Sequence, residues 1–171
     1  MKKLITLIIA LFVLSVATAF AQTNTADIGV TADVLAELNV AGTDVSFGNV
    51  TQGSVAEVQA NTNDTANPSS NASAPVAGSL TITADGQDYI VEVTQSAILE
   101  NGAADQLTFT HRVFDGGTDV TADVDGAGYN VTGGGNLTLD IGGQLQSPTA
   151  AGNYSTATSG TPLVFEVNYV I

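Results

Sequence analysis

Residues 27–40 read DIGVTADVLAELNV, and in this stretch apolar side chains occupy every even position, while Leu35 is the one apolar residue at an odd position. Successive side chains of a β-strand point to opposite faces, so this alternation predicts one strand with a buried apolar face. At about 3.3 Å per residue the strand would span roughly 40 Å, which is long for a globular domain. Its predicted apolar face consists of Ile28, Val30, Ala32, Val34, Ala36, Leu38 and Val40.

The same two-residue period recurs along the rest of the chain, whereas a helical period is never sustained over the length of a helix. The turn signal Asp85-Gly86 divides one such stretch, which predicts a hairpin over residues 79–94. The pair Gly142-Gly143 interrupts another and indicates a bulge or bend. We therefore expect a single all-β domain folded as an antiparallel β-sandwich. Its expected strands include 45–47, 56–60, 79–84, 89–94, 107–113, 137–145 and 163–171.

The start of the chain has the pattern of an export signal rather than of a folded element. Two lysines precede an apolar run over residues 4–16, and Ala19-Phe20-Ala21 provides a small-x-small cleavage site. The apolar run is too short for a good membrane anchor, and no later run approaches spanning length. We predict a signal peptide over 1–21, a mature domain over 22–171 without a membrane span, and export to the periplasm, the cell surface or the medium.

Residues 61–77 differ from the rest of the predicted domain. They read NTNDTANPSSNASAPVA, a polar stretch of low complexity that contains two prolines. Such composition is typical of a loop, so we predict a long flexible loop inside the domain. Too little chain precedes this loop for it to mark a domain boundary.

Removal of the signal would leave a strongly acidic chain. The sequence holds three basic and seventeen acidic residues, and two of the basic residues are Lys2 and Lys3. One positive charge against seventeen negative charges gives the mature chain a formal charge of −16. Phosphate binding needs a basic footprint, so this charge excludes a nucleic-acid partner. Because the sequence has no cysteine, stability has to come from burial and hydrogen bonding.

The residue types present give little support to a catalytic centre. His111 is the one histidine, and it falls on the same strand face as Leu107, Phe109 and Val113, which indicates a packed histidine rather than a general base. Its neighbour Arg112 would point to the opposite face of the strand. Paired carboxylates could hydrolyse glycosides, but the sequence has no tryptophan to accompany them. We predict that the protein is not an enzyme.

The best candidate for cation binding is the acidic stretch over residues 115–126. Calcium takes about six to eight oxygen ligands, and glycine permits the tight turns that such a loop needs. The spacing does not match an EF-hand loop, so a solvated connection between strands is the competing interpretation. The candidate calcium ligands are Asp115, Asp119, Asp123 and Asp125.

Glycan binding would need an exposed aromatic ring. Among the four tyrosines, Tyr129 is the one plausible exposed ring, because it lies in a glycine-rich stretch that follows the acidic residues. The competing interpretation is a loop aromatic that pins its own turn.

Several short motifs follow one another in an informative order. Val45-Ser46-Phe47-Gly48-Asn49-Val50 closes an early predicted strand, and Val167-Asn168-Tyr169 lies in the last one. Between them come Gly134-Gly135-Asn136-Leu137, Ile141-Gly142-Gly143-Gln144-Leu145 and Ala151-Gly152-Asn153-Tyr154. In this order and spacing, across residues 24–171, the chain resembles the DUF4402 family of bacterial domains.

That family is similar in layout to spore-coat-U-like and archaic chaperone–usher pilin domains. The resemblance therefore implies an immunoglobulin-like sandwich and a surface or fimbria-like role. In such pilins the sandwich lacks one strand, and the N-terminal extension of the next subunit supplies it. The spore-coat-like relatives carry a cysteine near the end of the first strand, where this chain has Leu38 or Asn39, so their disulfide is absent here.

Two hypotheses for function follow from these observations. The first is an exported structural protein without a cofactor, fimbrial-subunit-like or part of a surface matrix, which associates with itself or with related surface subunits. In the most specific version of this hypothesis, residues 26–40 are the strand donated to another subunit, and the last strand, 163–171, borders the groove that receives such a strand. The second is a monomeric secreted binding module for calcium or a glycan. The donor-strand candidates are Ile28, Val30, Ala32, Val34, Ala36 and Leu38.

Overall fold

The computed structural model describes residues 37–65, 71–102, 105–157 and 160–170, all within one unit of the chain, Leu35–Ile171. The described residues form antiparallel sheets and one short helix, α2 (Thr121–Val124). The two main sheets pack face to face over a shared apolar core. The prediction of an all-β antiparallel sandwich is confirmed. The predicted signal peptide lies outside the described residues.

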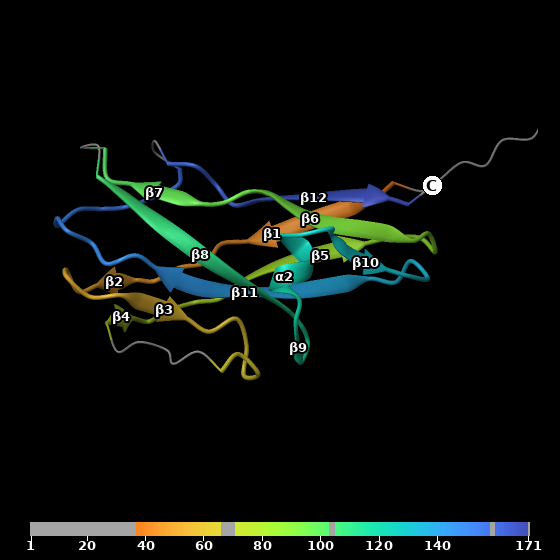
Figure 1. Cartoon of the computed structure of the whole chain (residues 1–171), viewed down its shortest axis with the longest axis horizontal. Coiled ribbons are helices and arrows are strands. Elements are labelled where there is room, and N and C mark those ends of the chain that lie inside the picture. The colour runs from red at the N-terminus through yellow and green to blue at the C-terminus, as the bar shows by residue number, and fades with distance from the viewer. Residues whose placement is uncertain (1–36, 66–70, 103–104, 158–159, 171) are drawn as a thin grey trace, which may run out of the picture. The chain divides into compact units, whose positions relative to one another are not determined.

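The larger sheet has the strand order β1-β5-β11-β8-β7 (Figure 1). β3 continues this sheet beside one end of β11, and β9 pairs with the end of β8. The strands are β1 (Asn39–Thr43), β3 (Ala56–Val58), β5 (Gly78–Thr83), β7 (Ile98–Glu100), β8 (Gln106–Asp115), β9 (Thr118–Asp119) and β11 (Leu137–Leu145).

The smaller main sheet has the order β10-β6-β12, made by β10 (Tyr129–Val131), β6 (Tyr89–Gln95) and β12 (Val164–Tyr169). Figure 1 shows β6 and β12 side by side, as their registered pairing requires. A separate two-stranded ribbon joins β2 (Asn49–Val50) to β4 (Ala72–Ser73).

The hairpin predicted over residues 79–94 is wrong, although both of its strands exist. β5 pairs with β1 and β11, whereas β6 pairs with β10 and β12, so the chain crosses between the sheets at Asp85-Gly86. Ile82 of β5 and Tyr89 of β6 then both contribute to one core. Alternation fixes which face of a strand is apolar but not which strand lies beside it, so a hairpin and an arch between sheets share one sequence pattern.

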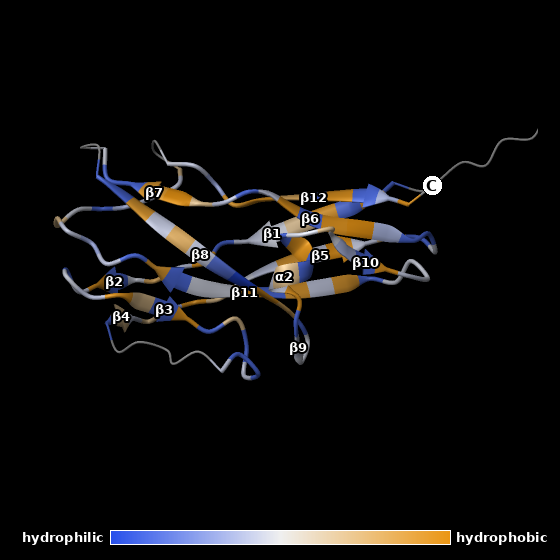
Figure 2. Cartoon of the chain, viewed as in Figure 1, coloured by the Kyte–Doolittle hydropathy of each residue, from blue (hydrophilic) through white to orange (hydrophobic). Residues whose placement is uncertain are grey.

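Buried side chains form two clusters, and the predicted alternation is visible in both. Along β8 every odd residue from Leu107 to Val113 is buried, and Figure 2 shows the corresponding bands of colour. The main core consists of Leu80, Ile82, Tyr89, Val91, Val113, Val120, Val124, Leu137, Leu139 and Ile141. The second core consists of Phe47, Ala56, Val58, Ala97, Leu107, Phe109 and Leu145.

Of the bulge or bend predicted at Gly142-Gly143, the bulge is absent from the pairing register of β11 with β8. β11 pairs without a shift from Leu139 opposite Asp115 to Leu145 opposite Phe109. The glycines are needed for close backbone approach instead, since a Cβ on Gly142 would lie 2.3 Å from the backbone nitrogen of Ala60. A glycine inside a strand has both interpretations, and here close approach is the correct one.

The Phe47-Gly48 motif has a structural explanation at the second core. The ring of Phe47 packs edge-on against Phe109 with 5.8 Å between centroids. Gly48 has a φ of 62°, and a Cβ there would lie 1.8 Å from the carbonyl oxygen of Ser73. Ser73 belongs to the predicted loop 61–77, so part of that stretch forms β4 and a further bridge to Ser46 rather than irregular chain.

The outer face of the larger sheet carries a compact ionic cluster around Arg112. Its Nε donates to Asp64 Oδ2 at 3.1 Å, and its Nη2 donates to the carbonyl oxygen of Val58 at 3.5 Å. The same Asp64 oxygen accepts the backbone N–H of Ala60 at 3.0 Å, and the Asp64 side chain is only 2% exposed. Arg112 stands opposite Gly142, where no side chain blocks its path to Asp64. The segment from β3 to Asp64 is thereby fastened onto the sheet.

Candidate functional site

Two edge strands of the sandwich border one groove. β1 pairs only with β5 among the described strands, and β12 pairs only with β6. The groove between them has a volume of about 640 Å³ and receives residues from both edges, including Thr43 of β1 and Phe165 of β12. This volume falls within the usual range of ligand-binding sites, roughly 300–1,000 Å³.

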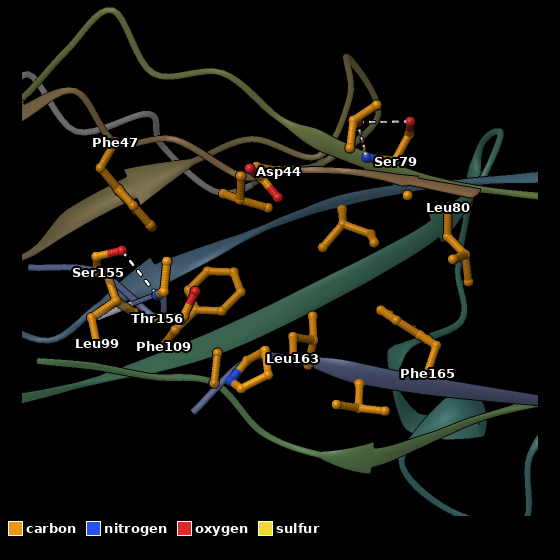
Figure 3. Close-up of a pocket in the computed structure, with 18 of the residues that line it drawn as sticks. Asp44, Phe47, Ser79, Leu80, Leu99, Phe109, Ser155, Thr156, Leu163 and Phe165 are labelled. Carbon is orange, nitrogen blue, oxygen red and sulfur yellow. Dashed lines mark hydrogen bonds between the residues drawn. The ribbon is translucent and has the colours of Figure 1, made fainter. Parts of the chain in front are cut away.

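The floor of the groove is apolar because side chains of both cores line it. Figure 3 shows the side chains of Leu80, Phe109 and Leu163 gathered around it. Leu80 belongs to the main core and Phe109 to the second core, and Leu163 packs against both. At one end lie polar residues of the connection between β11 and β12, among them Ser155 and Thr156. The groove therefore combines an apolar floor and a polar end beside two strand edges.

The inner face of β1 explains why the groove is open. Residues that stand opposite each other in an antiparallel pair share a face, so Val40 faces inward with Ile82, and Gly42 faces inward with Leu80. Gly42 has no side chain to cover Leu80. Val40 remains 43% exposed, although Ile82 beside it is fully buried. Within the described part of the chain, the inner face of β1 is therefore only partly covered.

Most of the predicted donor strand lies outside the described residues. This applies to Ile28, Val30, Ala32, Val34 and Ala36. Leu38 is described and packs partly buried against the main core, on the face that the alternation predicts. Regular pairing begins at Asn39 and continues to Thr43, beyond the end of the alternating stretch. All five residues of β1 are exposed, so half-burial of this strand is not observed in the described part.

The candidate calcium ligands do not gather into one site. Asp115 Oδ2 accepts the hydroxyl of Tyr129, Asp119 Oδ1 accepts the backbone N–H of Thr121, and Asp125 Oδ1 lies 2.8 Å from His111 Nε2. Asp123 is exposed on α2. Among the described residues, no group of three or more histidine or acidic side chains could hold a metal ion. The stretch instead forms the hairpin between β8 and β9 and the helical turn α2.

His111 has the packed position that its strand face predicts. It is 7% exposed inside the sandwich, and its hydrogen bond with Asp125 joins β8 to the end of α2. Arg112 contacts Asp64 on the opposite face of the same strand. The two residues therefore do not share a site, and each fastens a separate connecting segment to β8.

Tyr129 is not the exposed ring that glycan binding would need. It is half-buried against the main core, and its hydroxyl donates to Asp115 Oδ2 at 2.6 Å. This hydrogen bond, together with burial and the nearby carboxylates, raises the pKa of Tyr129 to about 12. Burial also raises the pKa of Tyr89. The ring pins its own segment to the sandwich, as the competing interpretation holds.

We expect the unfolding free energy to fall as the pH rises from about 10 to about 12. In this window the unfolded tyrosine has lost its proton while folded Tyr129 keeps it, so the native state binds more protons and alkali favours unfolding. Below pH 10 the contribution of protonated Tyr129 to the free energy of unfolding is fully present. Denaturant titrations across this range test the slope, and Tyr129→Phe should reduce it. An alkaline absorbance titration in which every tyrosine loses its proton near pH 10 would contradict the raised pKa of Tyr129.

No helix in the described ranges is long and apolar enough to cross a membrane. In comparisons with known proteins, no family model and no curated protein matches the chain. The similarity to the DUF4402 family therefore stays a prediction from motifs. The functional argument depends on the groove itself.

Proposed function

We propose that this protein is an exported, non-enzymatic structural subunit, fimbria-like or matrix-forming, and that its groove receives the N-terminal strand of a second copy. The observation that carries the proposal is a groove with an apolar floor, bordered by two strands that each pair on one side only in the described part of the chain. The segment that precedes them alternates like a strand. An added strand gains main-chain hydrogen bonds from the edge and places alternate side chains on the apolar floor.

The length of the open edges supports strand addition. In the described part of the chain β1 and β12 have five and six residues, whereas the other edge strands have two or three. β7 is additionally covered, because Ile98 and Glu100 bridge to Thr161 and Ser155. Proteins usually protect long edges with proline, lysine or a covering segment, since an open edge invites pairing with another chain. Neither β1 nor β12 contains proline or lysine, and both border the same groove.

A second copy fits the groove better than the chain's own N-terminal segment. For residues 26–36 to pair with β1 of the same chain, the backbone would have to reverse at Glu37-Leu38. Two-residue hairpin turns require positive φ angles and therefore favour asparagine, aspartate and glycine. Leu38 also packs against the main core and is poorly suited to the tip of a turn. Both observations favour a second copy, rather than the same chain, as the acceptor of residues 26–36.

Deleting residues 22–34 is expected to abolish assembly and leave a folded monomer. The test compares the mature chain and the deletion variant by electron microscopy and by gel electrophoresis without boiling. Fibres or ladders are expected for the mature chain only. Assembly by the deletion variant would refute strand donation, and unfolding of that variant would show that the strand completes its own sandwich. A discrete mature monomer whose melting temperature rises with calcium would favour the binding-module hypothesis.

A variant that fills the groove tests the receiving role of one molecule separately from the strand-donating role of another. Gly42→Phe places a ring over Leu80, and no backbone atom comes closer than 3.7 Å to its Cβ. The matched control is Ala41→Phe, whose side chain lies on the opposite face of the same strand. We expect Gly42→Phe to block assembly and Ala41→Phe to permit it. Mixing Gly42→Phe with the deletion variant should yield a dimer and nothing longer, because one supplies the strand and the other the groove.

A further inference from the structure

The mature chain offers almost no cleavage site to one large class of proteases. Trypsin-class enzymes require lysine or arginine before the cut bond, and the sequence contains only Lys2, Lys3 and Arg112. The two lysines lie in the predicted signal peptide. Arg112 is then the single residue of the mature chain that such an enzyme can recognise. Where Arg112 lies in the fold decides whether the protein can be cut.

Arg112 lies in the middle of β8, and hydrogen bonds hold that strand on both sides. On one side residues 109–115 pair in continuous register with β11. On the other side Val113 donates its N–H to Thr121 Oγ1 at 2.8 Å and accepts the N–H of Val120 at 2.9 Å. A protease binds several residues around the cut bond in an extended form, so β8 would have to leave the sheet before cleavage.

The side chain of Arg112 is occupied as well. The specificity pocket of a trypsin-class enzyme encloses the arginine side chain and pairs its guanidinium with a carboxylate. In the folded protein the guanidinium of Arg112 already contacts the buried Asp64, and the Arg112 side chain is only 23% exposed. Because the strand contributes Val113 to the main core and Phe109 to the second core, its release would open both. Cleavage would therefore require an opening close to global unfolding.

We propose that the folded domain resists proteases with basic specificity, and that Arg112 becomes a cleavage site only when the sandwich opens. This property goes beyond the assembly role and does not depend on it. When opening is fast relative to cutting, cleavage follows the population of the open form. The equilibrium constant between the folded and the unfolded form of a domain is about 10³ or more. Cleavage of the folded chain should therefore be at least about 10³-fold slower than cleavage of an unstructured peptide.

The test uses a protein of residues 22–171 to which no lysine or arginine has been added. It is incubated with trypsin, and mass spectrometry follows the appearance of fragments 22–112 and 113–171. The unstructured reference is a synthetic peptide spanning residues 106–118. The measurement uses the monomeric fraction, so that assembly cannot cause the protection. We expect the peptide to be cut readily and the folded chain to remain intact, with the rate after Arg112 rising with urea as the chain unfolds.

The matched control is Asn153→Arg, which adds a basic residue at an exposed position between β11 and β12. We expect native cleavage after position 153 while Arg112 in the same molecule stays uncut. Native cleavage after Arg112 within about tenfold of the peptide rate would overturn the proposal. Equal resistance at position 153 would also overturn it, because strand pairing could not then be the cause.

Discussion

Arg112→Met is expected to lower the free energy of unfolding by about 3–5 kcal/mol, which is a large part of the stability of an ordinary domain. The substitution removes the guanidinium beside the carboxylate of Asp64, whose side chain is only 2% exposed. A buried carboxylate that loses its cation is costly, whereas exposed ion pairs contribute little. Urea unfolding at pH 7 measures the loss.

Two further variants identify the cause of that loss. Adding Asp64→Asn to Arg112→Met removes the buried charge but keeps an oxygen for the N–H of Ala60, so at least half of the stability should return. Thr110→Met changes an exposed residue on the same face of β8 and should stay within about 0.5 kcal/mol of the parent protein. A cost below about 1 kcal/mol for Arg112→Met would show that the cluster is only a surface feature.

Ile82→Ala is expected to destabilise the monomer by about 2–5 kcal/mol, because it opens a cavity in the main core. Its matched control is Val40→Ala, at the position directly opposite on the same face. Val40 is 43% exposed, so its truncation should cost about 1 kcal/mol or less in the monomer. Equal losses for the two variants would show that the inner face of β1 at Val40 is covered in solution.

The same pair of variants distinguishes the monomer from the assembled form. If a donated strand covers Val40 in the assembly, Val40→Ala should weaken the polymer more than it weakens the monomer. Ile82→Ala should weaken both to a similar extent, because Ile82 is already fully buried. Thermal melting of monomer and polymer fractions measures both effects.

Strand positions and buried faces were largely predictable from the sequence. The alternation identified the inward residues of β8 and the face of β12 that carries Phe165 and Tyr169. It also placed His111 inside and Arg112 outside. These predictions succeed because the two-residue period of a strand is a local property that depends on the backbone alone. Phe114 is an exception, since it is buried although Val113 beside it faces the core.

Partners across the fold could not be predicted in the same way. No local pattern indicates that Asp64 would meet Arg112, because the two residues are brought together by β3 and β11. The crossing at Asp85-Gly86 was missed for the same reason. The groove depends on Gly42, which follows the alternating stretch, and on a last strand more than a hundred residues later. That Gly42 leaves the space over Leu80 without a side chain can be inferred only once the pairing register of β1 and β5 is known.

The crossing between the sheets at Asp85-Gly86 also bears on how quickly the native state can be reached. Because β5 and β6 do not pair, the first partners of β5 are β1, with Asn39 opposite Thr83, and the much later β11. Closing such long loops costs chain entropy before any contact compensates for it, and folding rates fall as the separation of paired residues grows. A newly made chain would therefore keep the apolar faces of its early strands uncovered until the C-terminal third is available for pairing.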